Sequence, residues 1–268
     1  MKRAIWLVAV AGFAMLILGC KGDEKTAEAP PPAATKAEAP APAATTPPGQ
    51  PEAAATVPAE APRAGYDHAL LRPAMLKEKA PETYQVRFVT TRGDFTVTVH
   101  RGWAPIGADR FYNLVKHHFY DNASFFRVVP GFVVQFGISA YPPVSAAWEN
   151  ANIMDEPVVG SNKRGYLTYA KTSRPNTRST QIFINLKDNA GLDAQGFSPF
   201  GVIDAQGMRV VEMMYDQYGD STPDNFQDLI TKAGKPYLDK NWPKLDSIKT
   251  ATVVGEAAPR AAPSAKQR

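Results

Sequence analysis

Cysteine is almost absent from this chain of 268 residues, which contains a single one, Cys20. A chain with one cysteine forms no internal disulfide and builds no zinc site from several thiolates. The chain also lacks runs of basic residues with interleaved aromatics, which excludes the usual nucleic-acid-binding surface. The formal net charge of +4 is small, and it falls to +2 when two cations, Lys2 and Arg3, are removed with a leader.

Motifs for several kinds of catalysis are missing as well. The chain has no glycine-rich phosphate loop and no Gly-x-Ser-x-Gly nucleophile elbow. His117 and His118 are adjacent, so on a helix they face different directions, and we expect them near a helix C-terminus instead of at a metal. Asp155 and Glu156 precede Pro157, and we expect a solvated loop there. The sequence therefore predicts no metal site and no cofactor.

Residues 1–19 have the pattern of a lipoprotein signal peptide. After a positively charged start, the apolar stretch from Ala4 to Leu18 is too short for a comfortable membrane span. The tetrapeptide ending at Cys20 (ILGC) resembles a bacterial lipobox, which implies cleavage before Cys20 and lipid attachment to it. The alternative is a lone buried cysteine after an ordinary signal peptide. Because Lys21 follows in place of aspartate, we expect an exported protein anchored at the periplasmic face of the outer membrane.

The composition divides the rest of the chain into three parts. Residues 20–64 are rich in alanine and proline, and ten of the 24 prolines fall between Pro30 and Pro62. With almost no large apolar residues, this segment cannot bury enough surface to fold, so we expect a disordered tether. Residues 256–268 have a similar composition and are expected to form a disordered tail. The folded domain is therefore predicted over residues 65–255.

Periodicity within this domain predicts many short strands and few helices. Alternating apolar residues on both sides of Arg92-Gly93 predict a β-hairpin, and a helix is expected from Pro105. The fold class we predict is mainly β: a closed antiparallel eight-stranded barrel capped by two helices, with a C-terminal helical extension. The further expected elements are strands around Pro130-Gly131, over Gly165–Ala170, Gln181–Leu186, Phe200–Asp204 and Ser247–Val254, a second helix through Val210, Val211, Met214 and Tyr218, and a third through Phe226, Leu229 and Ile230 that stops before Pro236.

The segment FFRVVPGFVVQFG, residues 125–137, is the most informative in the chain. Its alternation projects Arg127, Phe132 and Gln135 from one sheet face, into what should be a shallow apolar groove. Polar groups among apolar neighbours need partners, because burying them alone is costly. The alternatives are a strand-end arginine that braces the barrel, a satisfied core glutamine, and plain core phenylalanines for Phe132 and Phe183.

This set of side chains suits the rotation of a prolyl bond. The amide barrier is roughly 18–20 kcal/mol, and uncatalysed exchange takes tens to hundreds of seconds. No bond breaks, so neither a nucleophile nor a metal is needed. The catalyst needs a slot for the proline ring, groups that hold the flanking carbonyls, and a hydrogen-bond donor where the lone pair of the prolyl nitrogen localises. A permanently charged guanidinium is a good donor of this kind.

The same segment resembles the signature strand pair of the cyclophilin-type peptidyl-prolyl cis-trans isomerases. The sequence of that pair is typically FHRVIPGFMIQGGD. Residues 170–172 with 179–185 resemble the ART…TSQFFIN segment of bacterial members, and residues 189–193 with 200–201 resemble NxxLD…FG. The resemblance runs from about residue 85 to residue 218. It implies a cyclophilin-like barrel and a monomeric isomerase without cofactor, whose partners are proline-containing segments of unfolded or exported proteins.

The resemblance also implies a role for each matching residue. Arg127 would act on the prolyl nitrogen, and Gln135 would hold a substrate carbonyl. The other implied positions all contact or support the bound peptide: Phe132, Val133, Phe183 and Leu192 at the proline slot, Ala170 and Lys171 through their backbone groups, Gln181 in support of that wall, and Phe197 where family members have histidine or an aromatic residue.

Some positions depart from the family pattern. Val133 replaces a common methionine, and Phe136-Gly137-Ile138 replaces GGD after Gln135. Gly191 stands where many eukaryotic members have the tryptophan that matters for cyclosporin affinity, which predicts weak inhibition by that drug. The departures keep open an alternative function, a non-catalytic module that binds proline peptides as a chaperone or assembly partner. The intact Arg127, Phe132, Gln135 and Phe183 favour the enzyme.

Overall fold

The computed structural model describes residues 65–220 and 225–254. The expected signal peptide, Cys20, the tether and the tail lie outside these residues. None of the helices in the described part of the chain is long and apolar enough to cross a membrane. The strands are β1 Thr83–Thr90, β2 Asp94–His100, β3 Arg127–Val129, β4 Val133–Phe136, β5 Tyr166–Tyr169, β6 Ile182–Asn185, β7 Pro199–Ile203 and β8 Ile248–Val254.

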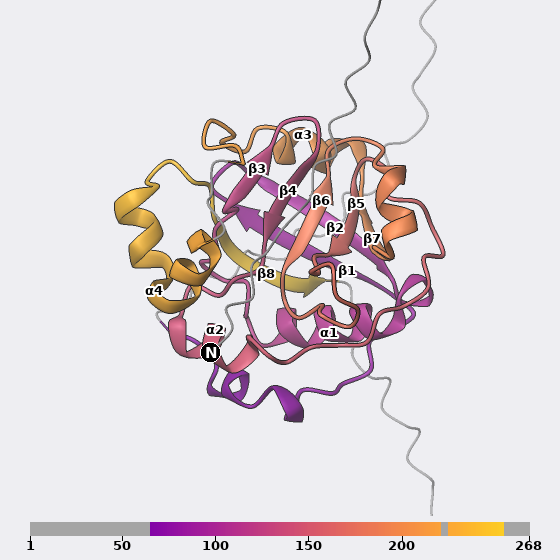
Figure 1. Cartoon of the computed structure of the whole chain (residues 1–268), viewed down its shortest axis with the longest axis horizontal. Coiled ribbons are helices and arrows are strands. Elements are labelled where there is room, and N and C mark those ends of the chain that lie inside the picture. Colours follow the sequence, from indigo (N-terminus) through magenta and orange to yellow (C-terminus); the bar gives the residue numbers. More distant parts are fainter. Residues whose placement is uncertain (1–64, 221–224, 255–268) are drawn as a thin grey trace, which may run out of the picture. The chain divides into compact units, whose positions relative to one another are not determined.

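The strands form one antiparallel sheet in the order β3-β4-β6-β5-β7-β2-β1-β8. The sheet curls so that its two edges approach each other just before β3 and β8 (Figure 1). There, Ser124 and Ser247 form an isolated bridge, the Phe125 amide donates to the Asp246 carbonyl at 2.9 Å, and the Ile248 amide donates to the Ala123 carbonyl at 2.9 Å. The predicted mainly-β, eight-stranded antiparallel fold is confirmed, with closure limited to this short contact.

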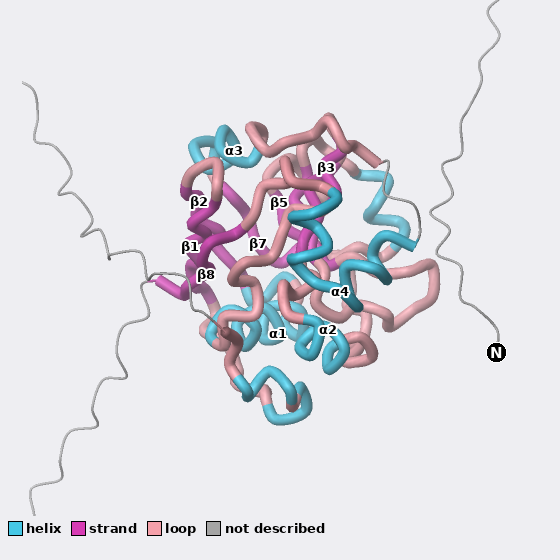
Figure 2. Tube along the Cα trace, turned by 90° about the vertical axis from the view of Figure 1, so that its left-hand side faces the viewer, coloured by secondary structure: helices cyan, strands magenta, loops and turns pink. Residues whose placement is uncertain are grey.

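Helices cover both ends of the curled sheet. Helices α1 and α2 lie at one end and α3 at the other, in both views (Figures 1 and 2). The α-helices are α1 Pro105–Lys116, α2 Pro142–Trp148, α3 Ala205–Val211 and α4 Asn225–Asn241, and the short 3-10 helices are η1 His68–Leu71, η2 Pro73–Met75, η3 Arg101–Trp103 and η4 Ala190–Gln195.

The core fills the inside of the sheet, as the alternation predicts. On β1 the buried residues are every second one, including Val86 and Phe88, both with no exposed surface. Phe136 turns the same way from β4 and packs its ring against Phe88 at 5.8 Å and against Phe125 at 5.4 Å. Helix α1 begins at Pro105, whose missing N–H costs nothing at the first helical position.

The Asp155–Glu156 segment corrects the sequence-based expectation of a solvated loop. Glu156 is buried, and its two carboxylate oxygens accept hydrogen bonds from the backbone N–H groups of Ile106 and Gly107, at 2.6 and 3.0 Å. These are first-turn donors of α1, whose own N-cap residue, Ala104, has no side chain to satisfy them. Glu156 therefore caps the helix from 49 residues away in sequence, and its charge also suits the positive end of the helix dipole.

The second expected helix is shorter than its apolar spacing suggests. Helix α3 ends at Val211, although Met214 is still buried. After Val211 the amides of Met213 and Met214 donate to carbonyls only three residues earlier, and the Tyr215 amide then donates to the Asp246 carboxylate at 2.7 Å, outside any helix. Helix α2, in contrast, was not predicted.

The third expected helix is present as the first part of α4 and breaks two residues before Pro236. Gly234 has φ +64° and ψ −157°, outside the helical region. A Cβ on Gly234 would lie 2.4 Å from the Ala140 carbonyl oxygen, so the backbones approach too closely for any other residue. Helix α4 docks here beside α2 (Figure 2). It buries Ile230 and Leu238 with Phe126 and Ile138 in a second small hydrophobic cluster.

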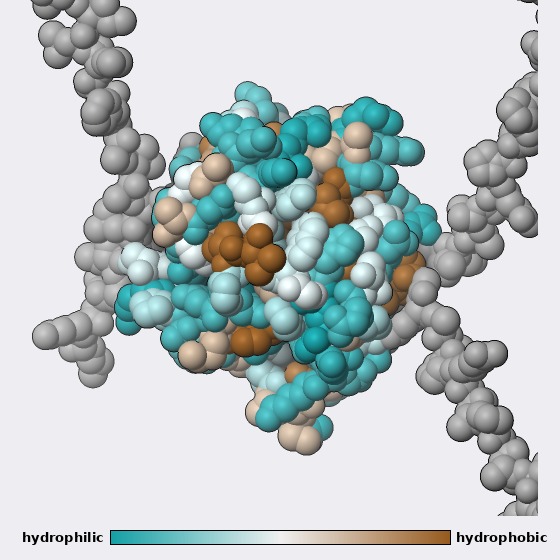
Figure 3. Space-filling view, turned by 90° about the vertical axis from the view of Figure 1, so that its right-hand side faces the viewer, coloured by the Kyte–Doolittle hydropathy of each residue, from teal (hydrophilic) through white to brown (hydrophobic). Residues whose placement is uncertain are grey.

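The face of the molecule in Figure 3 is mainly hydrophilic, with hydrophobic residues in small, separate patches. In the described part of the chain the most exposed large apolar side chains are Met75, Val159 and Met154, at 73%, 67% and 60% exposure. Scattered single apolar residues of this kind are normal on a soluble surface.

Candidate functional site

Arg127, Gln135 and Phe183 form a row across three neighbouring strands. Arg127 on β3 lies directly opposite Gln135 on β4, and Gln135 lies directly opposite Phe183 on β6. Directly opposed residues of an antiparallel sheet share a face, so the three side chains project on the side away from Val134 and the core. The alternation in the sequence predicted this shared face for Arg127 and Gln135.

Hydrogen bonds link this row to both of its sides. The Arg127 Nη1 donates to the Gln135 Oε1 at 3.2 Å, and the Gln135 Nε2 donates to the Gln181 Oε1 at 2.8 Å. On the outer side, the Arg127 Nε donates to the Asp220 Oδ1 at 2.5 Å. The arginine side chain is 16% exposed, so the guanidinium remains at the surface and is not sealed beneath the sheet.

Phe132 borders the row at the turn between β3 and β4. Its ring centroid lies 5.8 Å from the Arg127 Cζ. The turn depends on Gly131, whose φ of +65° is a conformation that glycine adopts at low cost. The Phe132 carbonyl accepts hydrogen bonds from the Leu186 amide at 2.9 Å and the Asn189 Nδ2 at 3.1 Å. These bonds fix the backbone of Phe132 relative to the end of β6.

Phe183 and Phe197 form an apolar wall on the other side. Their rings pack edge to face with centroids 5.7 Å apart. The Lys171 Nζ lies 5.6 Å from the Phe197 ring centroid and 3.3 Å from the Asp155 Oδ2, so the lysine is held between a ring and a carboxylate. Leu192 is half-buried in η4, and its carbonyl accepts the Phe197 amide at 3.3 Å.

Val133 and Ala170 complete the predicted set. Val133 lies two residues before Gln135 on β4, on the same face, and is 2% exposed. The Ala170 amide donates to the Gln181 carbonyl at 2.9 Å, which extends the pairing of β5 and β6 by one residue. In the described residues the Ala170 carbonyl accepts no hydrogen bond, so it is a backbone group that can accept one from a peptide.

A buried polar network supports the wall of Phe183 and Phe197 from the protein interior. Asn162 has no exposed surface, and its Nδ2 donates to the Asp193 Oδ1 at 2.7 Å and to the Phe197 carbonyl at 2.9 Å. Desolvation raises the pKa of Asp193, but hydrogen bonds from Ser161 and Asn162 outweigh it and hold the pKa below the usual value. The ionised carboxylate therefore keeps η4, and with it Leu192, in place near neutral pH.

The departure from the family's GGD has a structural explanation. Phe136 faces the core and not the row, so its size does not affect the predicted site. Gly137 keeps the close approach that follows Gln135: a Cβ there would lie 2.4 Å from the Thr180 carbonyl oxygen. Ile138 belongs to the second hydrophobic cluster under α4.

The two adjacent histidines lie at the end of α1 as expected. His117 follows the helix, and its Nδ1 is 2.6 Å from the Asp67 Oδ2. The His118 Nδ1 lies 3.1 Å from the Asp121 Oδ2, and its φ of +59° takes it out of the helical conformation. Each ring therefore contacts a different carboxylate.

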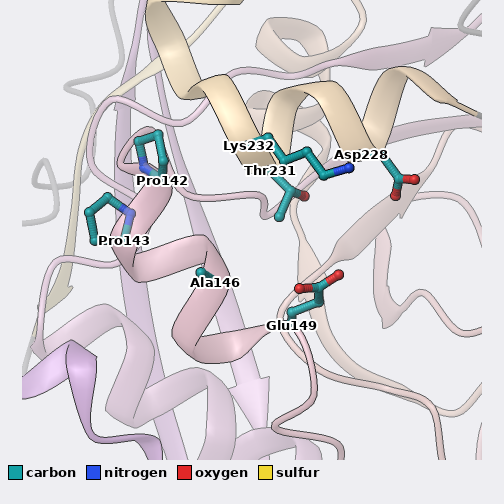
Figure 4. Close-up of a pocket in the computed structure, with 7 residues that line it drawn as sticks. All are labelled: Pro142, Pro143, Ala146, Glu149, Asp228, Thr231 and Lys232. Atoms are coloured by element: carbon teal, nitrogen blue, oxygen red, sulfur yellow. The ribbon is translucent and has the colours of Figure 1, made fainter.

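A separate pocket lies between α2 and α4 (Figure 4). Its lining mixes charged and apolar side chains, and none of the predicted site residues lines it. The residues that line it are Pro142, Pro143, Ala146, Glu149, Asp228, Thr231 and Lys232.

Sequence reasoning missed the residues that hold the site from a distance. Asp220 contacts Arg127 across 93 residues, and its segment has no motif that indicates this contact. Asn162 and Asn189 support Phe197 and Phe132 through partly buried hydrogen bonds to their carbonyls. The only available signal for Asn189 was its place in the segment that resembles NxxLD.

Comparison with known proteins gives a consistent result. The family model described as cyclophilin type peptidyl-prolyl cis-trans isomerase/CLD matches residues 85–235. A peptidyl-prolyl cis-trans isomerase of Acinetobacter baylyi is 35% identical over 132 residues, which are 47% of this chain and 69% of the relative. Peptidyl-prolyl cis-trans isomerase B of Escherichia coli is 30% identical over 172 residues, 64% of this chain and 99% of the relative. A crystal structure of a cyclophilin type isomerase from Cryptosporidium parvum aligns over 66% of this chain and 99% of its own, with a TM-score of 0.47 and 19% identity.

Proposed function

This chain belongs to the cyclophilin-type peptidyl-prolyl cis-trans isomerases and is an enzyme of that class, and we propose that it assists the folding of exported proteins at the cell envelope. Its substrates are X–Pro bonds in unfolded or newly exported chains. Cys20 carries the lipid anchor, and residues 20–64 tether the domain at the periplasmic face of the outer membrane. The signal-peptide pattern and the lipobox-like ILGC support this location.

The row of Arg127, Gln135 and Phe183 on one sheet face is the observation that carries the proposed mechanism. The proline ring packs between Phe132, Phe183 and Leu192, and the Ala170 carbonyl and Gln135 hold the flanking backbone. Arg127 donates to the prolyl nitrogen as the amide twists and its lone pair localises. Because this bond forms only in the twisted state, it lowers the barrier without tightening the ground state.

Lipid labelling tests the anchor. Cells that express the full chain and grow with a labelled fatty acid should yield labelled protein in the membrane fraction, because the lipobox directs acylation of Cys20. The Cys20→Ser variant should lose the label and keep the longer, unprocessed length. Equal labelling of the two proteins, or label in neither, would mean that Cys20 is not the anchor.

Cyclosporin binding tests how Gly191 shapes the binding face. Gly191 is exposed in η4, and a Cβ there meets no atom within 4 Å, so the backbone accepts a larger side chain at this position. We expect wild type to bind cyclosporin weakly and Gly191→Trp to bind it roughly tenfold tighter, because a buried aromatic ring adds about 1.5–3 kcal/mol of apolar contact. Isothermal titration measures the difference.

The matched control for this experiment is Ala194→Trp. It adds the same ring at another exposed position of the same 3-10 helix. Its affinity should stay at the wild-type value. If Gly191→Trp binds no more tightly than Ala194→Trp, the absent tryptophan is not what weakens cyclosporin binding.

A further inference from the structure

Asp220 joins the catalytic face from a part of the chain that lies outside the predicted motifs. Its Oδ1 accepts a hydrogen bond from the Arg127 Nε at 2.5 Å, a charge-assisted contact. The Arg127 Nη1 is held at the same time by the Gln135 Oε1 at 3.2 Å. In the described residues, the third nitrogen, Nη2, has no hydrogen-bond partner.

A guanidinium is planar, so fixing two of its nitrogens fixes the direction of the third. We propose that Asp220 is a positioning residue for the isomerase reaction: with Gln135, its carboxylate sets the plane of the Arg127 guanidinium and leaves Nη2 for the prolyl nitrogen. The inference rests on the proposed role of Arg127 as the donor to that nitrogen.

Asp220 is presented by an anchored turn. The Gly219 amide donates to the Asp216 carbonyl at 2.8 Å, and Gly219 has φ +56°. Two residues before Asp220, the Tyr218 ring packs at 4.9 Å against both the Tyr215 ring and the Trp242 ring. The carboxylate therefore approaches Arg127 from a turn that aromatic packing holds in place.

The C-terminal extension around this turn is also packed against the strand that carries Arg127. Phe126, the residue before Arg127, is 1% exposed and belongs to the cluster that Ile230 and Leu238 of α4 complete. At the kink, the Lys235 amide donates to the Ala140 carbonyl at 3.1 Å. The extension and the catalytic strand thus share a core, which keeps the separation of Asp220 and Arg127 small.

The ion pair of Asp220 and Arg127 contributes little to the free energy of folding, so its loss should affect the rate more than the stability. The Asp220 side chain is 59% exposed, and exposed ion pairs contribute only about 0–1 kcal/mol to folding because water and salt screen them. An arginine that is not held must lose rotational freedom in the transition state, which raises the barrier. Removal of Asp220 should therefore slow turnover and leave substrate binding and melting temperature nearly unchanged.

The test compares Asp220→Ala with wild type in the full chain. Isomerisation of an uncharged proline peptide is followed by NMR exchange at several peptide concentrations, so no coupling protease acts on the chain. We expect kcat to fall roughly three- to tenfold, which corresponds to about 0.7–1.4 kcal/mol of barrier, while KM stays the same. Asp220→Glu, which keeps the carboxylate, should restore most of the rate. Salt at about 1 M should slow wild type toward the variant and leave the variant unaffected, because it screens the ion pair.

Asp216→Ala is the matched control, since it removes the same charge from the same turn, and the side chain of Asp216 contacts Gln217 and not Arg127. Its kcat should equal that of wild type. The inference is overturned if Asp220→Ala keeps the wild-type rate, if it is faster because the carboxylate masks the arginine, or if Asp216→Ala loses as much. If Arg127→Ala isomerises the peptide as fast as wild type, the proposed mechanism is refuted, and the inference loses its premise.

Discussion

Arg127→Ala is expected to lower kcat/KM for proline-peptide isomerisation by about 10²–10³-fold, the usual loss when a preorganised donor to a developing charge is removed. Arg127 is the only charged side chain in the row across β3, β4 and β6, within the described residues. Gln135 and Gln181 do not replace it, because their amides are neutral and cannot supply the charge-assisted bond of a guanidinium. The rest of the face would still bind the peptide, so the loss should appear in kcat.

The fold should survive this substitution. The Arg127 ion pair involves a carboxylate that is 59% exposed, so its loss costs about 0–1 kcal/mol of folding free energy. NMR exchange measures the rate, and calorimetry of the same samples measures the melting temperature. Arg87→Ala, on β1 in a partly exposed pair with Asp94, serves as the control and should keep the wild-type rate.

Two results would contradict the assignment. A wild-type rate in Arg127→Ala would remove the arginine from the reaction. A large fall in melting temperature would show that the arginine braces the strand end, which is the alternative role that the sequence left open. Arg127→Lys separates charge from shape, because lysine keeps the charge but lacks the planar fork that Asp220 and Gln135 hold. It should remain well below wild type.

Local sequence patterns predicted the parts of the fold that depend on neighbouring residues. The alternation around Arg92-Gly93 gave the β1–β2 hairpin, and apolar spacing after Pro105 gave α1. The same alternation, with the turn at Gly131, placed Arg127 and Gln135 on one face, because register in a tight hairpin follows from the turn. Phe183 could be placed beside them only through the family resemblance, since pairing of β4 with β6 is not local.

Contacts between distant segments could not be predicted. The sequence around Glu156 suggests a solvated loop, and its burial depends on α1 and on Arg178, which is 22 residues further along the chain. The Asp220 contact spans 93 residues. Charged side chains have no periodicity that indicates a distant partner, so tertiary structure decides whether such a residue is exposed or buried.

Two departures from the family signature become understandable in the structure. Phe126 and Ile138 stand where the typical signature has histidine and aspartate. Both are buried in the second hydrophobic cluster, against Ile230 and Leu238 of the extension. Apolar residues suit these positions, because helix α4 covers both of them in this cluster. Neither substitution removes a residue of the row.

The buried ion pair of Arg178 and Glu156 carries the largest expected effect on stability. The Arg178 side chain is 1% exposed, and its Nη1 donates to the Glu156 Oε2 at 2.9 Å. Its Nη2 also donates to the Met154 carbonyl. Arg178→Met fills much of the same volume but leaves the carboxylate of Glu156 buried without its cation. Breaking a buried pair in this way costs about 3–5 kcal/mol, so the melting temperature should fall by roughly 10 °C.

Calorimetry of single and double variants distinguishes a lost charge from lost packing. Arg164→Met removes an arginine from an exposed pair, in which both side chains are 42% exposed, and should cost less than about 1 kcal/mol. Glu156→Gln keeps an oxygen that can accept one of the α1 amides, and combined with Arg178→Met it leaves no unpaired charge at position 156. The double variant should therefore be less destabilised than the sum of the two single ones, by about 0.5–3 kcal/mol. Strict additivity, or an Arg178→Met variant as stable as Arg164→Met, would show that packing and not the buried charge pair holds the 154–156 segment against α1.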